Sequence, residues 1–445
     1  MSHSEPGTAA ISIGALYERM PVTARHWQAG LVLFMAFVIE SWEMMTLILC
    51  GPSVTKDLGI DYVVLGSLLG ALFFGMIPGA FAWAWISDRF GRRASIMWSL
   101  ASYGAVSLAS SMAPDAGSLW TLRFICGFAL AGVLVNTFPY FEELLPAAVR
   151  GKAAVYLAAG WPLGLLISIG VVHAFSEAGW RWTVRASSLT GLWAIAVWLW
   201  VPESPYWLQQ KGRLIQARDV IRRLWGATWP SHHDQRPIAP AQAAAAEAGS
   251  GLLGLFRGHQ LRVTLLQTVV NFTFSWGYWA LTSWMPTLLA KRGLDAPQGL
   301  GFMALSALFM FPGYIAASFL TGRWGRKRVM VSFVACAAIC GFGLAASGSI
   351  TTMMAWNFGL SFFSLGAWGV WNTWMGELYG TELRAIGYGW GIAAQRVANA
   401  IAPAAIGAVL ATQGYVTTVT FIAAFLAATV VASAFIHETE GTTLE

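Results

Sequence analysis

Long apolar runs separated by short polar loops dominate the chain. Each run has about 20 residues, the length that a helix needs to cross a bilayer core of roughly 30 Å. Twelve such runs lie at 28–50, 62–86, 94–112, 118–141, 152–175, 181–201, 262–289, 299–321, 329–348, 354–376, 386–410 and 415–436. The pattern predicts an all-α membrane protein with twelve transmembrane helices, and the even number places both termini on one side.

One polar connection is longer than the others and separates two sets of six runs. It covers 202–261 and contains a helix-like stretch, LIQARDVIRRLW. The predicted order is an N-terminal cytoplasmic tail, a six-helix bundle, a cytoplasmic linker, a second six-helix bundle and a C-terminal cytoplasmic tail, at 1–27, 28–201, 202–261, 262–437 and 438–445.

Composition and charge support a membrane protein and give its orientation. The chain is 57% hydrophobic and 11% charged, whereas about 25% of residues are charged in soluble domains. If the N-terminus is cytoplasmic, the tails and loops on that side hold 20 of the 27 lysine and arginine residues, and the opposite loops hold five. The positive-inside rule therefore predicts that both termini of this multi-pass protein are cytoplasmic. The expected location is the bacterial inner membrane. The net charge of +6 is then a topology signal, and we expect no nucleic-acid partner.

The two halves repeat at a fixed offset of 234 residues. SDRFGRR at 87–93 matches GRWGRKR at 322–328, and EELLPAAVRG at 142–151 matches GELYGTELRA at 376–385. The same offset pairs Ser41-Trp42 with Ser275-Trp276. A 6+6 repeat is the architecture expected of a transporter whose site lies between the halves.

These motifs resemble those of the major facilitator superfamily. ISDRFGRR resembles the signature between helices 2 and 3, RFICGFALAG resembles the helix 4 signature, and PESPYWL resembles the sequence after helix 6 in sugar and organic-ion carriers. The resemblance implies two pseudo-symmetric six-helix bundles and a monomeric transporter.

Within the superfamily, the chain is most similar to the aromatic acid:proton (metabolite:proton) symporters. The similarity lies in an acidic pair in helix 1, in ELYGTELRAIGYG and in AAQRVANAIAP. The chain departs from that branch in two places: Glu40-Ser41-Trp42-Glu43 replaces D-G-x-D, and Gln395-Arg396 replaces Gly-Arg.

Four charged residues lie inside the predicted helices. A charge at the bilayer centre costs about 2.5–3.5 kcal/mol, so such residues face a cavity or a partner. By depth, Glu40 lies level with Arg396, and Glu43 lies level with Arg123. Their counterparts at the repeat offset are uncharged, namely Phe274, Pro162, Gly277 and Asn357. Charges that do not repeat in a repeated scaffold favour a functional role over the alternative of structural ion pairs that lock helices.

The charge balance suggests a mechanism. If both glutamates are ionised, they balance Arg123 and Arg396, and an entering anion leaves the site unbalanced unless a proton accompanies it. We therefore assign proton coupling to Glu40, Glu43 and Arg123. Arg396 is assigned to a substrate carboxylate, because the guanidinium offers a planar fork for that group.

Further residues are predicted on helices 1, 7, 10 and 11. Tryptophan faces can stack on a planar substrate. The alternative is that these tryptophans belong to the interface belt or to packing, because the chain has 24 of them. The predicted substrate-binding residues besides Arg396 are Trp42, Trp276, Trp371, Asn372 and Gln395.

A cytoplasmic gate is predicted where the loop motifs meet the membrane. The alternative for its arginines is a role in topology alone, although this does not explain the aspartate. The gate residues are Asp88, Arg89, Arg92, Arg93, Glu143, Arg150, Glu377 and Arg384.

The overall prediction is a proton-coupled secondary transporter that imports a small organic anion, aromatic or carboxylate, by alternating access. An organic-cation or sugar transporter of the same superfamily is the alternative. The sequence has no H-E-x-x-H, G-x-S-x-G or Walker motif, so we expect no enzyme activity, no metal and no cofactor. The expected partners are a small-molecule substrate, protons and the lipid bilayer.

Overall fold

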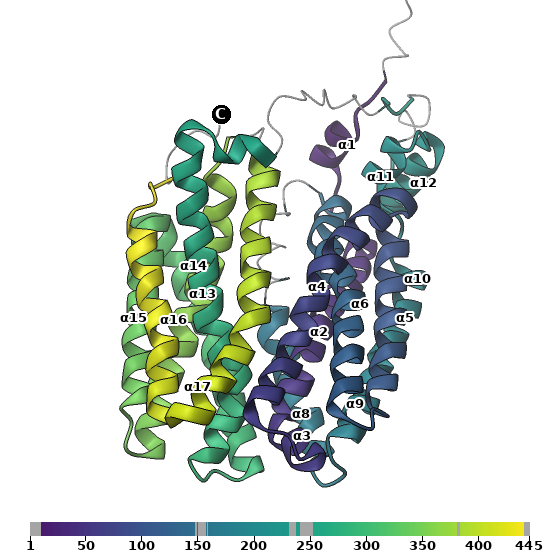
Figure 1. The fold of residues 1–445 in the computed structure, drawn as a ribbon. Helices are drawn as coiled ribbons and strands as arrows, with labels where there is room; N and C mark the ends of the chain where they lie inside the picture. Colours follow the sequence, from purple (N-terminus) through teal and green to yellow (C-terminus); the bar gives the residue numbers. More distant parts are fainter. Residues whose placement is uncertain are drawn as a thin grey trace, which may run out of the picture.

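The computed structural model describes residues 10–146, 149, 157, 159–230, 237–240, 252–380 and 383–439. Figure 1 shows two groups of long helices that stand side by side. Within the described ranges, the only pairing of extended backbone is an isolated bridge between Ile11 and Ile238. The predicted all-α class is confirmed.

The helices of the first group are α2 (Ala24–Leu49), α3 (Gly51–Leu58), α4 (Tyr62–Phe90), α5 (Arg92–Ser110), α6 (Ala116–Leu144), α8 (Gly160–Ala174), α9 (Trp180–Ser188), the 3₁₀ turn η2 (Leu189–Leu192) and α10 (Trp193–Trp200). Short helices before and after this group are α1 (Ile13–Arg19), α11 (Pro205–Gln210), α12 (Leu214–Trp225), η3 (Gly226–Thr228) and η5 (Leu252–Phe256). The second group contains α13 (Gly258–Lys291), α14 (Ala296–Trp324), α15 (Arg326–Ala345), α16 (Ile350–Glu377) and α17 (Arg384–Ala434).

Each of the twelve predicted spans overlaps helical residues. Among the described residues, six helices are long and apolar enough to cross a membrane by length and composition, namely α2, α4, α6, α14, α15 and α17. The sixth predicted span is not one regular helix, because η2 separates α9 from α10. The last two spans form α17, which breaks at Gly414 with φ +74°, a backbone conformation that glycine tolerates and other residues rarely adopt.

The 234-residue repeat extends to the ends and bends of the helices. Helices α4 and α14 both begin at an aspartate N-cap and both contain a proline. Helices α5 and α15 both follow a glycine with positive φ. The paired positions are Asp61 with Asp295, Pro78 with Pro312, and Gly91 with Gly325. The two halves therefore share the caps, prolines and glycine turns of these helices, as the predicted pseudo-symmetric architecture requires.

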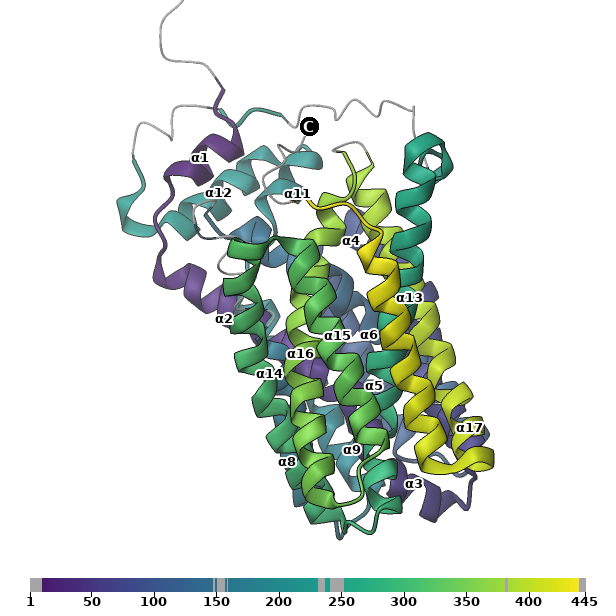
Figure 2. The same ribbon diagram turned by 90° about the vertical axis from the view of Figure 1, so that its left-hand side faces the viewer.

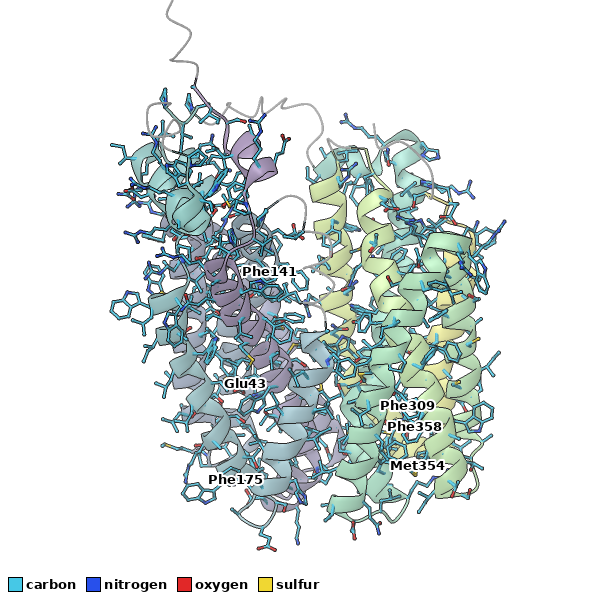
Figure 3. The ribbon with its side chains drawn as sticks, turned by 180° about the vertical axis from the view of Figure 1, so that it is seen from behind. Glu43, Phe141, Phe175, Phe309, Met354 and Phe358 are labelled. Carbon is cyan, nitrogen blue, oxygen red and sulfur yellow. The ribbon has the colours of Figure 1, made fainter. Side chains whose placement is uncertain are left out.

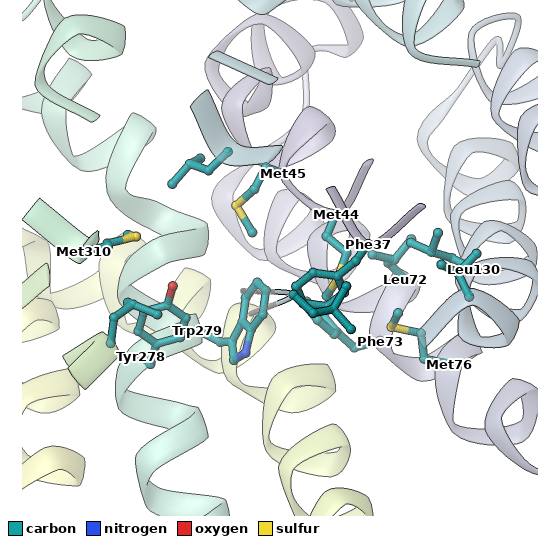
Figure 4. Close-up of a cluster of buried hydrophobic side chains, with 14 of the residues drawn as sticks. Phe37, Met44, Met45, Leu72, Phe73, Met76, Leu130, Tyr278, Trp279 and Met310 are labelled. Atoms are coloured by element: carbon teal, nitrogen blue, oxygen red, sulfur yellow. The ribbon is translucent and has the colours of Figure 1, made fainter. Parts of the chain in front are cut away.

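The two groups meet at the end that carries α3 and separate toward the end that carries α1 and α12 (Figures 1 and 3). Helix α4 packs closely on α17, where the Cα of Gly66 faces the backbone of Pro403 and that of Gly70 faces the backbone of Ala400. Nearby, the Phe73 ring makes an edge contact of 4.9 Å between centroids with the ring of Trp279 (Figure 4).

A small polar layer covers the opposite end of the first group. Helix α12 coincides with the predicted helix-like stretch of the linker. The Thr23 hydroxyl donates to the Leu224 carbonyl at 2.7 Å, and α1 lies beside α12 (Figure 2). The Ile11 amide donates to the Pro237 carbonyl at 2.8 Å, so part of the predicted N-terminal tail is folded against the linker.

Candidate functional site

Glu43 lies in the last third of α2 and is enclosed within the first helix group (Figure 3). The Tyr103 hydroxyl of α5 donates to its Oε2 at 2.5 Å. The Thr190 hydroxyl of η2 donates to its Oε1 at 2.6 Å. The side chain is 0% exposed, so each carboxylate oxygen is met by a dedicated donor rather than by bulk water.

A pair of glycines brings these donors to Glu43. Gly104 and Gly191 follow Tyr103 and Thr190 in sequence, and a Cβ on Gly104 would lie 2.8 Å from the Cα of Gly191. Helix α5 and η2 can therefore approach backbone to backbone only because both positions lack a side chain. This contact directs the two preceding hydroxyls at opposite oxygens of one carboxylate.

Arg123 lies on α6, close to this pocket. Its side chain is 3% exposed, and it interacts electrostatically with Glu43. No salt bridge joins them, and among the described residues the Arg123 Nε has no hydrogen-bond partner. The structure thus places the predicted pair in one buried environment, as neighbouring charges rather than as a closed ion pair.

Glu40 lies one helical turn before Glu43 and faces a different environment. It is 1% exposed, and within the described part of the chain its Oε2 has no hydrogen-bond partner. Its electrostatic partner is Arg396 of α17, in the second helix group. Arg396 precedes Ala400 by one turn on the α17 face that contacts α4, so this pair of opposite charges spans the two halves.

In the second group, two predicted substrate residues meet at Asn271 of α13. The Trp371 indole donates to the Asn271 Oδ1 at 2.9 Å, and the Gln395 amide donates to the same oxygen at 2.6 Å. Trp371 is fully buried and Gln395 is 4% exposed. Asn271 was not predicted as a site residue. Two polar amides four residues apart in an apolar run, Gln267 and Asn271, are nevertheless a sequence pattern that indicates a buried polar cluster.

The remaining predicted substrate residues lie apart from this cluster. Trp276 stacks on Phe425 of α17 with 4.6 Å between ring centroids. The half-buried Trp42 donates its indole N–H to Ser187 at 3.1 Å, inside the first group. Asn372 follows Trp371 on α16 and is half-buried. Substrate contact by these three side chains stays a prediction.

The predicted gate residues pair within their own halves. Arg92 contacts Asp88 at 2.8 Å and Glu143 at 3.6 Å. At the repeat offset, Arg326 forms a two-pronged contact with Glu377 at 3.0 and 3.1 Å. In this conformation these pairs brace helix ends inside each half and do not cross between halves.

The other gate residues have varied surroundings. Arg89 lies over the rings of Trp85 and Phe90, and Arg93 donates to the Trp198 carbonyl. Arg384 begins α17, and its Nε is buried without a partner among the residues described. Arg150 lies outside the described residues.

Two half-buried glutamates at this end, Glu203 and Glu438, were not predicted from the sequence. Glu203 accepts hydrogen bonds from the backbone N–H groups of Arg92 and Arg93 at 2.9 and 3.2 Å. Glu438 accepts from those of Arg326 and Lys327 at 3.0 and 3.1 Å. Burial raises the pKa of Glu203 above its ordinary value. Both acids occupy the N-terminal ends of α5 and α15, where a negative charge complements the helix dipole.

Known proteins resemble the chain along most of its length. The model of the Major Facilitator Superfamily matches residues 32–403. The niacin transporter NiaP of Acinetobacter baylyi is 27% identical over 434 residues, which cover 96% of this chain and 98% of that protein. The 4-hydroxybenzoate transporter PcaK of the same species is 27% identical over 418 residues, covering 90% and 88%. The xylose transporter XylE from E. coli, in a partially occluded inward open conformation, superposes with a TM-score of 0.77 at 17% identity, covering 95% of this chain and 100% of that one.

Proposed function

Because the chain belongs to the Major Facilitator Superfamily, a family of transporters rather than enzymes, we propose that it couples proton movement to the import of a small organic anion. The similar proteins NiaP and PcaK are named for niacin and 4-hydroxybenzoate, which are both aromatic carboxylic acids. An aromatic carboxylate is therefore the proposed substrate class. The proposed setting is the bacterial inner membrane, with the α1 end cytoplasmic and the protein monomeric.

The arrangement of four charges inside the predicted spans carries the proposal. Glu43 and Arg123 lie within one half, whereas Glu40 and Arg396 lie across the two halves. With both acids ionised, the four charges sum to zero, and an anion bound at Arg396 adds one uncompensated negative charge. In a low-dielectric interior such a charge is costly. Protonation of one glutamate restores the balance, so substrate and proton travel together.

The four charged residues and two of the predicted substrate residues have roles in this scheme. Arg396 binds the substrate carboxylate, because its planar fork matches two carboxylate oxygens. Glu40, whose Oε2 has no hydrogen-bond partner among the described residues, gives up its interaction with Arg396 when the substrate carboxylate binds there. Glu43 holds the transported proton between turnovers, since two hydroxyls and Arg123 define its environment. Gln395 and Trp371, joined through Asn271, form the wall beside the aromatic ring.

The way in which the halves meet supports alternating access as the proposed transport cycle. The helices are in contact at the α3 end and diverge at the opposite end (Figure 1). The gate residues pair within each half here, and we propose that they pair between halves when the α3 end opens. The observed arrangement is then the one that opens to the cytoplasm.

Uptake into proteoliposomes tests the proposal, with nicotinate and 4-hydroxybenzoate as probes. A pH gradient should drive accumulation by the unmodified protein. Glu43→Gln should abolish this accumulation while retaining exchange of labelled for unlabelled substrate, because exchange needs no net proton movement. The exposed Glu177 provides the control, since Glu177→Gln removes the same charge outside the site. Full gradient-driven accumulation by both Glu40→Gln and Glu43→Gln would refute proton coupling at these acids. Proton-coupled uptake of an amine and of neither acid would favour the organic-cation alternative.

A further inference from the structure

A groove on the outside of the second helix group combines cationic and apolar walls. It has a volume of about 770 Å³ and is lined by the end of α14, one face of α15 and the end of α17. Figures 1 and 2 show α15 and the yellow C-terminal part of α17 side by side at the edge of the molecule. The lining residues are Arg323, Trp324, Gly325, Lys327, Arg328, Val331, Ser332, Ala335, Ala434 and Glu438.

The positive charge of the groove is concentrated at its α1 end. Three cationic side chains, Arg323, Lys327 and Arg328, line it. None of the three forms a salt bridge within the described ranges, and Arg323 is held only over the ring of Phe319. The one carboxylate in the lining, Glu438, already accepts the backbone N–H groups at the start of α15. The groove therefore carries an excess of positive charge that its own residues do not neutralise.

The apolar part of the groove extends toward the middle of the membrane. Val331 and Ala335 lie on the same face of α15 as Arg328, and Ala335 is about 10 Å further along the helix. Ser332, Ala335 and Ala434 are small, so the hollow between α15 and α17 is not filled by side chains. Ile339, the next residue on this face, is 60% exposed. The groove thus opens onto the surface that faces lipid tails.

The internal repeat provides a comparison within the same molecule. At the equivalent place in the first half, Asp88 and Ala94 stand where the second half has Gly322 and Arg328. Asp88 binds Arg92 there at 2.8 Å. Relative to the first half, the second half thus has no carboxylate at one of these positions and has an added guanidinium at the other. The second half therefore carries two more units of positive charge here than the first half, beyond the arginines and lysines that both halves have at this end.

From these observations, we propose that the groove binds an anionic glycerophospholipid of the leaflet at the α1 end. The phosphate and headgroup lie against Arg323, Lys327 and Arg328, and one acyl chain lies along Val331, Ala335 and Ala434. Cations above an apolar channel match the two parts of such a lipid, and basic residues at this depth attract anionic lipid. The site is separate from the charges assigned to transport, so it stands or falls independently of the proposed function.

Native mass spectrometry of the full-length, delipidated protein tests this proposal. Phosphatidylglycerol, phosphatidylcholine with the same acyl chains, and glycerol 3-phosphate are titrated in turn. We expect phosphatidylglycerol to bind at least tenfold more tightly than either of the others. Equal binding of the two lipids would remove the anionic preference. Binding of glycerol 3-phosphate as tight as that of the lipid would make the groove a site for a free phosphate ester and overturn the lipid assignment.

The repeat also supplies the variants. Gly322→Asp with Arg328→Ala gives the second half the residues of the first, and a Cβ at Gly322 meets no atom within 4 Å. Each charge near an anionic lipid changes affinity about fivefold, so we expect a loss of roughly 25-fold for phosphatidylglycerol. Lys211→Asp, which changes the net charge by the same two units at an exposed residue outside the groove, is the control and should change affinity little. An unchanged preference in the folded double variant would refute the site.

Discussion

The contact between α4 and α17 allows a quantitative test of how the halves close. An ideal Cβ on Gly66 would lie 2.3 Å from the Pro403 carbonyl oxygen, and one on Gly70 would lie 2.4 Å from the Ala400 carbonyl oxygen. Ordinary contact begins near 3.4 Å, so alanine at either position requires the helices to separate by about 1 Å. Both obstacles are backbone atoms, which cannot rotate away as a side chain can.

The cost of this separation applies to one arrangement of the halves. Overpacking a close contact costs roughly 1–3 kcal/mol per site. Gly66→Ala with Gly70→Ala should therefore destabilise the arrangement closed at the α3 end by about 2 kcal/mol or more. An arrangement that is open at this end does not pay that cost. Since 1.4 kcal/mol is a factor of ten, its relative population should rise roughly 30-fold or more.

Distance measurements between spin labels report this shift. Lys56→Cys on α3 and Ala296→Cys at the start of α14 place exposed labels on the two halves at this end. The double glycine variant should show a longer distance between them. Gly301→Ala with Gly322→Ala is the control, because a Cβ at either position meets no atom within 4 Å while two glycines of a helix are again replaced by alanine. An unchanged distance distribution in the folded double variant would refute the reasoning, as would an equal shift in the control.

Three further predictions concern residues whose roles were not predicted from the sequence. Gly104→Ala should separate α5 from η2 and reduce pH-driven uptake without unfolding the protein. Gly170→Ala, with free space around it, should leave uptake unchanged, and equal uptake in both variants contradicts the role of the glycine pair. Asn271→Leu leaves two buried donors unpaired and should lower the free energy of unfolding by about 1–3 kcal/mol, so an unchanged thermal midpoint contradicts it. Burial raises the pKa of Glu203 above 4.5, so its contribution to stability is complete below that pH and declines as the pH rises through the folded-state pKa. The stability of Glu203→Gln relative to the unmodified protein should therefore increase from pH 4.5 to neutrality. A difference in stability that does not change with pH contradicts the raised pKa.

The fold could be predicted because each membrane helix is marked in the sequence by its own continuous run of apolar residues. Span lengths follow from bilayer thickness, and the boundary predicted between the last two spans, at 410–415, contains the break at Gly414. The repeat offset likewise located corresponding caps and prolines in the two halves. The broken sixth span was missed, because an apolar run does not reveal a short 3₁₀ segment inside it.

The site could be predicted only in part. Unpaired acids in apolar runs identified Glu40 and Glu43, because their cost in the membrane is independent of context. Their partners could not be found in this way. Tyr103 and Thr190 are 60 and 147 residues away from Glu43, and both are ordinary residues of apolar helices. Only the close approach of Gly104 and Gly191 brings them to the carboxylate, and that contact is a property of the packed structure.

The repeat also explains why the second half has no equivalent of the Glu43 pocket. At the offset of 234, Glu43 corresponds to Gly277, and its donors Tyr103 and Thr190 correspond to Ala337 and Ala424. Gly191 corresponds to Phe425, whose ring stacks on Trp276 and fills the space by apolar packing. The carboxylate, both of its donors and the small residue that admits them are thus present together in one half and absent together in the other. A structural ion pair could lose its members one at a time, whereas joint presence is what a proton site built from several parts requires.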